Sequence, residues 1–484
     1  MSIKKQAISS FGWILTEGLF SQGFLFIVGI ILARLLTPAD FGIIGIITAI
    51  IAISNSVVEG GFGSALIRKV NADTTDYNTI FYSNLTIAII IYFLLLLGAS
   101  TISDYFKVPL LSKIIPFAGI LLIINSFSIV QRAILTKVLN FKTQALISII
   151  ASFGSGIAAI YMAYENFGIW SLVTLAILRP FLNSILLWYH STWRPSLIFS
   201  IQSFKELFNY GYKLLITNLI HSFYRNIYYV LIGKYFNTQT LGFYTRAEQF
   251  QAPFSSNITT AIQRLSFPIL SKVQNDDILL KSRFIKFLRY SMFLNFTVMF
   301  VIAAVAEPMV ILLVGEKWRA SILYLQLLCV PGILYPLQIL HLNLLLVKGY
   351  SNLNLKLEII KKIILIPLVL VTALLGIEAL LLGIVLFAFI EYFINNYYTK
   401  TIIDYSLKKQ LKDIIPFLFM GIALFSLMYA ITFIDIGYLV MITVQVIIGI
   451  TFFIITNEFI KLPEYVEIKG KVFEFYNRAI KNGK

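Results

Sequence analysis

The sequence predicts an all-α integral membrane protein with about fourteen transmembrane helices. Of its 484 residues, 58% are hydrophobic and only 13% are charged, whereas soluble domains carry about 25% charged residues. Apolar stretches of about 20 residues, the length needed to cross a bilayer, recur along the whole chain. Short turn sequences such as TPADFG (Thr37–Gly42) and ENFG (Glu165–Gly168) separate them. No loop is long enough to hold a folded domain outside the membrane.

The order of these stretches gives the expected spans. We predict helices at residues 11–33, 41–66, 78–99, 114–136, 143–164, 168–190, 208–233, 240–270, 286–313, 320–347, 355–376, 378–398, 413–434 and 437–458. The apolar stretch of the first span is longer than a signal-peptide core, and no small-residue cleavage site follows it, so we expect it to remain as an uncleaved helix.

The distribution of lysine and arginine predicts the orientation. With the N-terminus in the cytoplasm, the cytoplasmic segments hold 28 of these residues and the outer segments hold six. Membrane proteins concentrate basic residues on the cytoplasmic side, so both termini are predicted to be cytoplasmic. The same bias accounts for most of the net charge of +16 without a nucleic-acid partner.

An internal repeat predicts the domain organisation. The segment ARLLTPADFGIIG (Ala33–Gly45) aligns with GKYFNTQTLGFYT (Gly233–Thr245) at an offset of 200 residues. An even number of helices per repeat keeps both copies in one orientation, related by an axis along the membrane normal. We therefore expect a six-helix bundle in residues 1–200, a second, pseudo-symmetric six-helix bundle in residues 201–400, and two further helices in residues 401–460.

The last segment, residues 461–484, has a different pattern. Apolar residues recur there at helical spacing with lysine and arginine between them: Val472, Phe475, Tyr476, Ala479 and Ile480. This pattern is typical of a basic amphipathic helix on the inner leaflet, and equally of a solvated tail.

Two of the predicted spans are unusually polar, and they occupy equivalent places in the two repeats. The span at 240–270 contains Arg246, Glu248 and Arg264 among many amides and hydroxyls, and the span at 41–66 contains Asn55 and Glu59. Because a charge facing lipid costs about 2.5–3.5 kcal/mol, such helices usually line a cavity. We therefore expect both to face one water-filled cleft.

Basic residues within or beside the spans are candidates for binding an anion. Arg179, Arg225 and Arg246 lie inside spans, and the guanidinium group suits phosphate oxygens because it presents a planar fork of donors. Each arginine has an alternative interpretation as the partner of a buried carboxylate. Arg34 and Lys234, at the outer ends of their spans, are weaker candidates that we expect to anchor the interface. Arg132, near the cytoplasmic end of its span, is expected to extend toward the interface.

Carboxylates inside the spans are candidates for ion coupling. Glu17, Glu59 and Glu248 would carry protons if burial raised the pKa of these carboxyls toward neutrality. No metal site is expected, because Cys329 is the only cysteine and the three histidines form no cluster with ligand spacing. No nucleotide-binding GxxxxGK[ST] sequence occurs either, so any energy would come from an ion gradient, from voltage or from a partner.

Several segments together resemble the oligosaccharide flippases of the multidrug/oligosaccharidyl-lipid/polysaccharide exporter superfamily, in particular the Wzx-type branch similar to colanic acid exporters. The resemblance covers about residues 5–460. The segments that carry it are LARLLTPADFGIIGI (Leu32–Ile46), GFGSALIRK (Gly61–Lys69), LIGKYFNTQTLGFYTRAEQF (Leu231–Phe250), FPILSKVQND (Phe267–Asp276) and GEKWRASILYLQLL (Gly315–Leu328).

The resemblance implies the fold of multidrug and toxic compound extrusion (MATE) transporters. It also implies a transporter, not an enzyme, that moves polyprenyl-diphosphate-linked oligosaccharides to the outer leaflet of a bacterial inner membrane by alternating access. Such a protein needs no cofactor, and H⁺ or Na⁺ are the candidate coupling ions. The expected partners are the lipid-linked oligosaccharide, membrane lipid, and a glycan polymerase with its chain-length machinery; we expect a monomer. The alternatives are a MATE-like antiporter for drugs or cations and, less favoured because the outer loops are short, a glycan polymerase or ligase.

Overall fold

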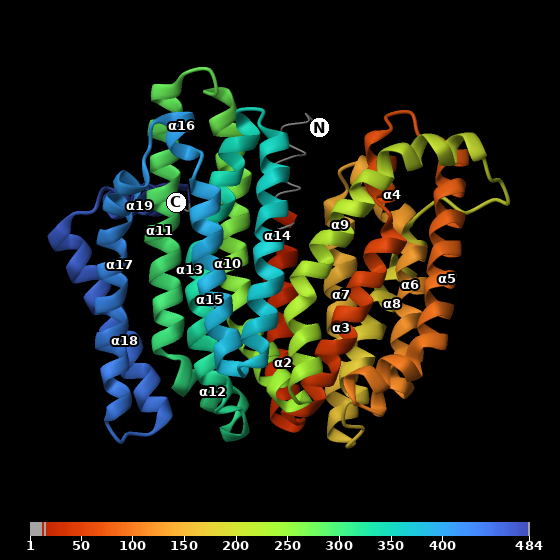
Figure 1. Cartoon of the computed structure of the whole chain (residues 1–484), viewed down its shortest axis with the longest axis horizontal. Coiled ribbons are helices and arrows are strands. Elements are labelled where there is room, and N and C mark those ends of the chain that lie inside the picture. Colours follow the sequence, from red (N-terminus) through yellow and green to blue (C-terminus); the bar gives the residue numbers. More distant parts are fainter. Residues whose placement is uncertain (1–11, 14–15, 483–484) are drawn as a thin grey trace. The chain divides into compact units, whose positions relative to one another are not determined.

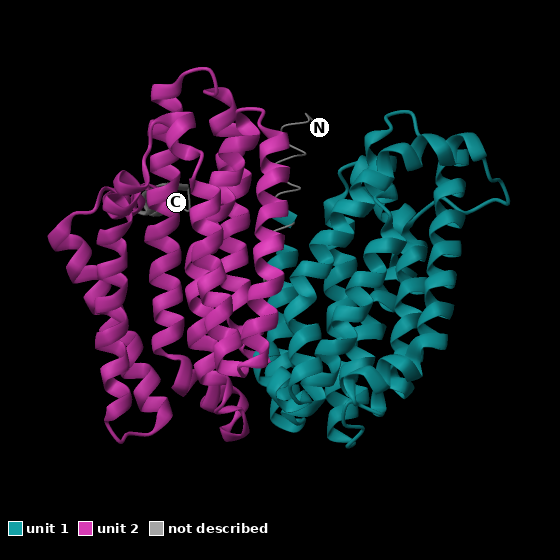
Figure 2. Ribbon diagram, in the orientation of Figure 1, with its two compact units in different colours: residues 1–245 teal, residues 246–484 magenta. Residues whose placement is uncertain are grey.

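The computed structural model describes residues 12–13 and 16–482, and every regular element in this part of the chain is a helix (Figure 1). The chain divides into two compact units, residues 1–245 and residues 246–484 (Figure 2). Each unit is described by itself below. The predicted assignment of residues 1–200 and 201–400 to two six-helix bundles stays a prediction.

The first unit is built from neighbouring helices joined by short turns. Pairs of consecutive helices, α5 with α6 and α7 with α8, pack side by side, and α9 packs along α3. The elements are η1 (Gly18–Gln22, one π-helical turn), α2 (Gly23–Leu35), α3 (Pro38–Glu59), α4 (Phe62–Arg68), α5 (Thr74–Phe106), α6 (Leu110–Lys137), α7 (Phe141–Tyr164), α8 (Trp170–His190), α9 (Ile201–Tyr235) and the first turns of α10 (Thr238–Lys272).

The second unit contains the rest of α10 and a set of helices in which α13 packs against α11 and α15, and α17 packs against α11 and α18. Its elements are α11 (Asp277–Ala304), α12 (Ala306–Val314), η2 (Glu316–Trp318), α13 (Ser321–Val347), α14 (Ser351–Leu374), α15 (Ile377–Asn396), α16 (Thr399–Ile403), α17 (Leu407–Tyr429), η3 (Ala430–Phe433), α18 (Tyr438–Ile460) and α19 (Pro463–Asn482).

Ten of the helical segments in the described part of the chain are long and apolar enough to cross a membrane. The prediction of an all-α membrane protein is confirmed at this level. The remaining predicted spans, at 11–33, 208–233, 240–270 and 355–376, correspond to helices that are shorter in the described residues or richer in polar and charged side chains. The count of fourteen crossings and the side on which the termini lie stay predictions.

The turn sequence Thr37–Gly42 starts α3 through a reciprocal cap. The Thr37 hydroxyl accepts a hydrogen bond from the Asp40 backbone N–H, and the Asp40 carboxylate accepts one from the Thr37 N–H at 2.9 Å. Pro38 follows as the first helical residue, where its missing N–H costs nothing. At the equivalent place 200 residues later, Asn237 accepts a hydrogen bond from the Thr240 N–H at 2.7 Å at the start of α10.

The first turns of α3 and α10 touch backbone to backbone. A Cβ atom added to Gly42 would lie 1.7 Å from the carbonyl oxygen of Thr238, and one added to Gly242 would lie 1.8 Å from that of Pro38. The contact is reciprocal, because Pro38 and Thr238 are also 200 residues apart, as are Gly42 and Gly242. Only glycine permits this approach, since the obstacle in each case is backbone and cannot rotate away.

The C-terminal helix α19 is held to the second unit by ion pairs. Arg289 on α11 donates to Glu464 at 2.5 Å and to Asp413 on α17 at 3.2 Å, and Lys286 donates to Glu467 at 2.7 Å. Lys469 pairs with Glu458 at the end of α18. The predicted helix is therefore present, while the side chains of Val472, Phe475, Tyr476, Ala479 and Ile480 lie outside the described part and its position on the membrane stays a prediction.

We predict that Gly42→Ala and Gly242→Ala each destabilise the protein by about 3 kcal/mol or more, at or above the upper end of overpacking costs, because the helices must move apart. Thermal unfolding in detergent measures the loss. Gly437→Ala is the matched control, since Gly437 has φ −57° and its added Cβ meets nothing within 4 Å. Equal melting temperatures for all three variants and the native protein would contradict the backbone contact between α3 and α10.

A second prediction concerns the pH range over which α19 stays docked. Hydrogen bonds from Lys286 and Lys471 lower the pKa of Glu467 to about 2 from its usual 4.5. A lowered pKa means that the stabilisation is complete above about pH 4.5 and is lost as the pH falls toward 2. A spin label at Gly470→Cys, in a chain whose native Cys329 is buried, should keep its mobility from pH 7 to 4.5 and gain mobility below.

The matched control is the same label in Glu467→Gln, in which a smaller pH-dependent step and greater mobility at neutral pH are expected. Release of the native helix already between pH 7 and 5 would show that other contacts hold it.

Candidate functional site

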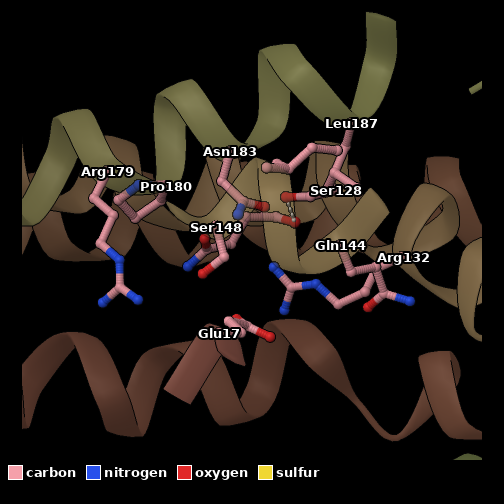
Figure 3. Close-up of a pocket in the computed structure, with 11 residues that line it drawn as sticks. Glu17, Ser128, Arg132, Gln144, Ser148, Arg179, Pro180, Asn183 and Leu187 are labelled. Carbon is pink, nitrogen blue, oxygen red and sulfur yellow. Dashed lines mark hydrogen bonds between the residues drawn. The ribbon is translucent and has the colours of Figure 1, made fainter. Parts of the chain in front are cut away.

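A polar cavity of about 360 Å³ lies among the helices of the first unit. It is bounded by the segment just before η1 and by α6, α7 and α8, and Figure 3 shows Arg132 and Arg179 projecting from their helices toward the segment that carries Glu17. The lining residues are Glu17, Asn125, Ser128, Arg132, Gln144, Ile147, Ser148, Arg179, Pro180, Asn183 and Leu187.

Arg179 lies at the middle of α8, the tenth of its 21 residues. At 1.5 Å per residue it is roughly 15 Å from either helix end, too deep to reach an interface easily. Its side chain is partly buried and interacts electrostatically with Glu17 and Arg132. The charged lining residues are two arginines and one glutamate, so the cavity has a net positive charge. The structure thus gives the guanidinium of Arg179 a polar cavity instead of lipid.

Arg132, which is exposed on α6, also lines this cavity, and its predicted extension toward the interface stays a prediction. Asn125, Ser128 and Arg132 are spaced by three and four residues on α6 and therefore share one face of that helix, and all three line the cavity. Asn183 follows Arg179 by four residues on α8 and lines it too. Helical spacing was the signal that would have predicted these additional cavity residues.

A second cavity, of about 250 Å³, adjoins the first and is apolar. Asn125 lines both cavities. Its side-chain amide N–H donates to the side-chain oxygen of Asn55 at 3.1 Å, and the Asn55 side-chain N–H donates to the Glu59 carboxylate at 3.0 Å. The lining residues of this second cavity are Ile44, Ile47, Thr48, Ile51, Ala52, Asn55, Ala118, Leu121, Asn125, Val173, Ala176 and Ile177.

The other cationic candidates do not line either cavity. Arg225 is exposed on α9, and Arg34 is exposed in the last turn of α2. Lys234 donates to the backbone carbonyl of Tyr105 at 2.7 Å, and its ammonium lies 3.8 Å from the centre of the Tyr105 ring. The proposed role of Arg34 and Lys234 as anchors, and that of Arg225 in substrate binding, stay predictions.

Arg246 has an aromatic environment that the sequence did not predict. Its side chain is 2% exposed, and its guanidinium lies 5.6 Å from the ring centre of Phe250 and 5.3 Å from that of the fully buried Trp318. Such cation–π contacts contribute about 2 kcal/mol when they are desolvated. Arg246 therefore joins two of the segments that carried the family resemblance, those containing Leu241–Ala247 and Gly315–Trp318. Its contact with substrate stays a prediction, as does ion coupling by Glu248.

The sequence analysis missed a buried charge cluster in the second unit. Lys361 was counted with the cytoplasmic segments, but it lies ten residues inside α14 with a side chain only 1% exposed. Its ammonium pairs with Glu358 one turn earlier and with Glu391 on α15 at 3.1 Å. The spacing of Glu358 and Lys361 by three residues was the available signal. Among the described residues, no group of three or more histidine, cysteine, aspartate or glutamate residues is arranged to hold a metal ion.

Helices of membrane length and a polar cavity with a net positive charge are typical of multi-pass membrane transport proteins. The chain belongs to the polysaccharide biosynthesis protein family, whose model matches residues 31–323. Relatives include the lipopolysaccharide biosynthesis protein WzxC of Escherichia coli (strain K12), 24% identical over 377 residues that cover 77% of this chain and 76% of that protein. Another is the teichuronic acid biosynthesis protein TuaB of Bacillus subtilis (strain 168), 26% identical over 305 residues, 61% and 62% of the two chains.

Solved structures show the same fold. The lipid II flippase MurJ in an inward closed conformation has a TM-score of 0.77 at 14% identity, covering 93% of this chain and 99% of its own. An inward-facing MATE family multidrug transporter has a TM-score of 0.61 at 14% identity, covering 82% and 99%. The predicted MATE-like fold is therefore confirmed.

We predict that Lys361→Met lowers the free energy of unfolding by about 3 kcal/mol. Removing one partner of a buried pair costs about 3–5 kcal/mol, and the low end applies because Glu358 and Glu391 are partly exposed. Lys356→Met is the matched control, because Lys356 is exposed on the same helix. Combining Lys361→Met with Glu358→Gln and Glu391→Gln should restore most of the loss. Denaturant titration in mixed micelles measures all of these free energies of unfolding. An unchanged stability of Lys361→Met would show that the cluster does not stabilise the fold.

Proposed function

We propose that this protein is a flippase that moves polyprenyl-diphosphate-linked oligosaccharide repeat units from the cytoplasmic to the outer leaflet of a bacterial inner membrane. Family membership supports a role in polysaccharide biosynthesis. One relative, WzxC, is named a lipopolysaccharide biosynthesis protein, and one structural neighbour, MurJ, is named a lipid II flippase. The observation that carries the proposal is the cavity with Arg132 and Arg179 facing Glu17.

The charge of this cavity fits a diphosphate. Two guanidinium groups offer more donors than the single Glu17 carboxylate can use, and a diphosphate supplies oxygens for the rest. A bound diphosphate would compete with Glu17 for the two arginines, so Glu17 is the first candidate for coupling transport to an ion gradient. Glu59 is a second candidate, because it accepts a hydrogen bond from Asn55, which in turn accepts one from Asn125 in the cavity lining.

The transport cycle that we propose is alternating access between two pseudo-symmetric halves of six helices each, followed by two further helices, with both termini in the cytoplasm. The reciprocal contact of Gly42 and Gly242, 200 residues apart, supports the symmetry. The sugar diphosphate would cross the membrane as a monomeric protein changes conformation, and a polymerase would consume it outside. Export of about two negative charges from an inside-negative cell gains about 2.3 kcal/mol per charge for each 100 mV.

An antiporter for organic cations is the second candidate. The MATE fold supports it, but a cavity with a net positive charge repels a cationic cargo. The polar lining of the cavity therefore favours the anionic substrate. A reconstituted assay that follows a fluorescent polyprenyl diphosphate sugar across liposomes, with and without an imposed voltage, tests the choice directly. Transport of an organic cation without any lipid flipping would overturn the proposed function.

We predict that Arg179→Gln and Arg132→Gln each slow flipping roughly tenfold to a hundredfold, because a hydrogen bond to a charged group contributes about 1.5–3 kcal/mol. Arg179→Lys should recover part of the rate, since it restores the charge without the fork of donors. Arg283→Gln, at an exposed arginine near the start of α11, is the control and should flip at the native rate. Native rates in both cavity variants, at equal protein levels, would exclude this cavity as the substrate site.

A further inference from the structure

The polar and the apolar cavity of the first unit meet at one residue. Asn125 on α6 lines both, and its amide is fixed by the hydrogen bond to Asn55 on α3. A single bonded side chain therefore stands at the junction, with about 360 Å³ on one side and about 250 Å³ on the other.

The chemistry of the lining changes sharply across this junction. Of the eleven residues around the larger cavity, only Ile147, Pro180 and Leu187 are apolar. Of the twelve around the smaller cavity, only Thr48, Asn55 and Asn125 are polar. The aliphatic side chains come from three helices, α3, α6 and α8, so the apolar half is lined by several elements and is more than one helix face.

Helix α8 runs along both halves and changes character at Pro180. Pro180 lines the polar cavity and has no N–H to donate to the carbonyl of Ala176, one turn earlier, which lines the apolar cavity. Arg179 and Asn183 line the polar cavity on either side of Pro180 in the sequence, and Val173 and Ile177 line the apolar cavity. Within about three turns, α8 thus contributes a charged and a polar side chain to the polar cavity and aliphatic side chains to the apolar cavity.

We propose that the two cavities form one site for the prenyl diphosphate portion of the substrate, with the diphosphate between Arg132 and Arg179 and the isoprene units next to it in the apolar cavity. This inference rests on the proposed flippase function and specifies what its site recognises. A prenyl diphosphate has the same sharp junction of charge and hydrocarbon as the lining. A sugar, which has hydroxyl groups on every side, leaves the aliphatic half without a complementary group.

Binding of water-soluble probes to the protein in lipid nanodiscs tests the proposal, with empty nanodiscs as the blank. Geranyl diphosphate should bind at least tenfold more tightly than inorganic diphosphate. A nucleoside diphosphate sugar, which lacks a prenyl chain, should bind no more tightly than inorganic diphosphate. Equal affinity for geranyl diphosphate and inorganic diphosphate, or a preference for the sugar nucleotide, would overturn the assignment.

The variant Ala176→Leu locates the preference, because it fills part of the apolar cavity with three more carbon atoms. It should remove the preference for geranyl diphosphate and leave the affinity for inorganic diphosphate unchanged, which also shows that the variant is folded. Ala158→Leu on α7, outside both linings, is the matched control and should keep the preference. If Ala176→Leu still binds geranyl diphosphate more tightly than inorganic diphosphate, the apolar cavity does not hold the isoprene units. Failure of the native protein to flip lipid-linked sugar in liposomes would separately refute the proposed function.

Discussion

The backbone contact between Gly42 and Gly242 fixes the position of α3, and the apolar cavity depends on α3. The contact leaves no room for a Cβ atom on either side, so the helix can neither slide nor rotate at its first turn without a clash. Ile44 and Ile47, which line the apolar cavity, follow within two turns. Asn55, thirteen residues beyond Gly42, is roughly 20 Å further along the helix and carries the bond to Asn125.

Two clusters of charged residues in this protein differ in their balance. In the second unit, Lys361 and its neighbour Lys362 are matched by Glu358 and Glu391. In the first unit, Arg132 and Arg179 share a cavity with Glu17 alone. In a balanced cluster the positive and negative side chains pair with one another, and the cluster has a structural role. In an unbalanced cluster, excess positive charge and hydrogen-bond donors are available to bind an anionic ligand. This difference is the physical reason for placing the substrate in the first unit's cavity.

The fold class followed from the sequence because apolar length and charge content are read along the chain, and ten helices of the described part are long and apolar enough to cross a membrane. Arg179 was correctly placed inside a helix, and helical spacing could have predicted its cavity neighbour Asn183, which the sequence analysis did not name. The place of Arg132 in the cavity lining was not predicted, because nearness to a helix end does not reveal which face of the helix a side chain occupies. The environment of Arg246 was beyond sequence reasoning, since Trp318 lies 72 positions away and meets it only through the packing of the second unit.

The named relatives also bear on what a shared site can recognise. WzxC is described by lipopolysaccharide and TuaB by teichuronic acid, yet both are similar to this chain over most of their length. Different polysaccharides have different patterns of hydroxyl groups, so a binding site shared by these proteins cannot be specific for one glycan. A junction of diphosphate and prenyl chain is chemically the same whatever sugar follows it. The abrupt change of lining at Asn125 matches that junction, and the sugars would then need only space and water.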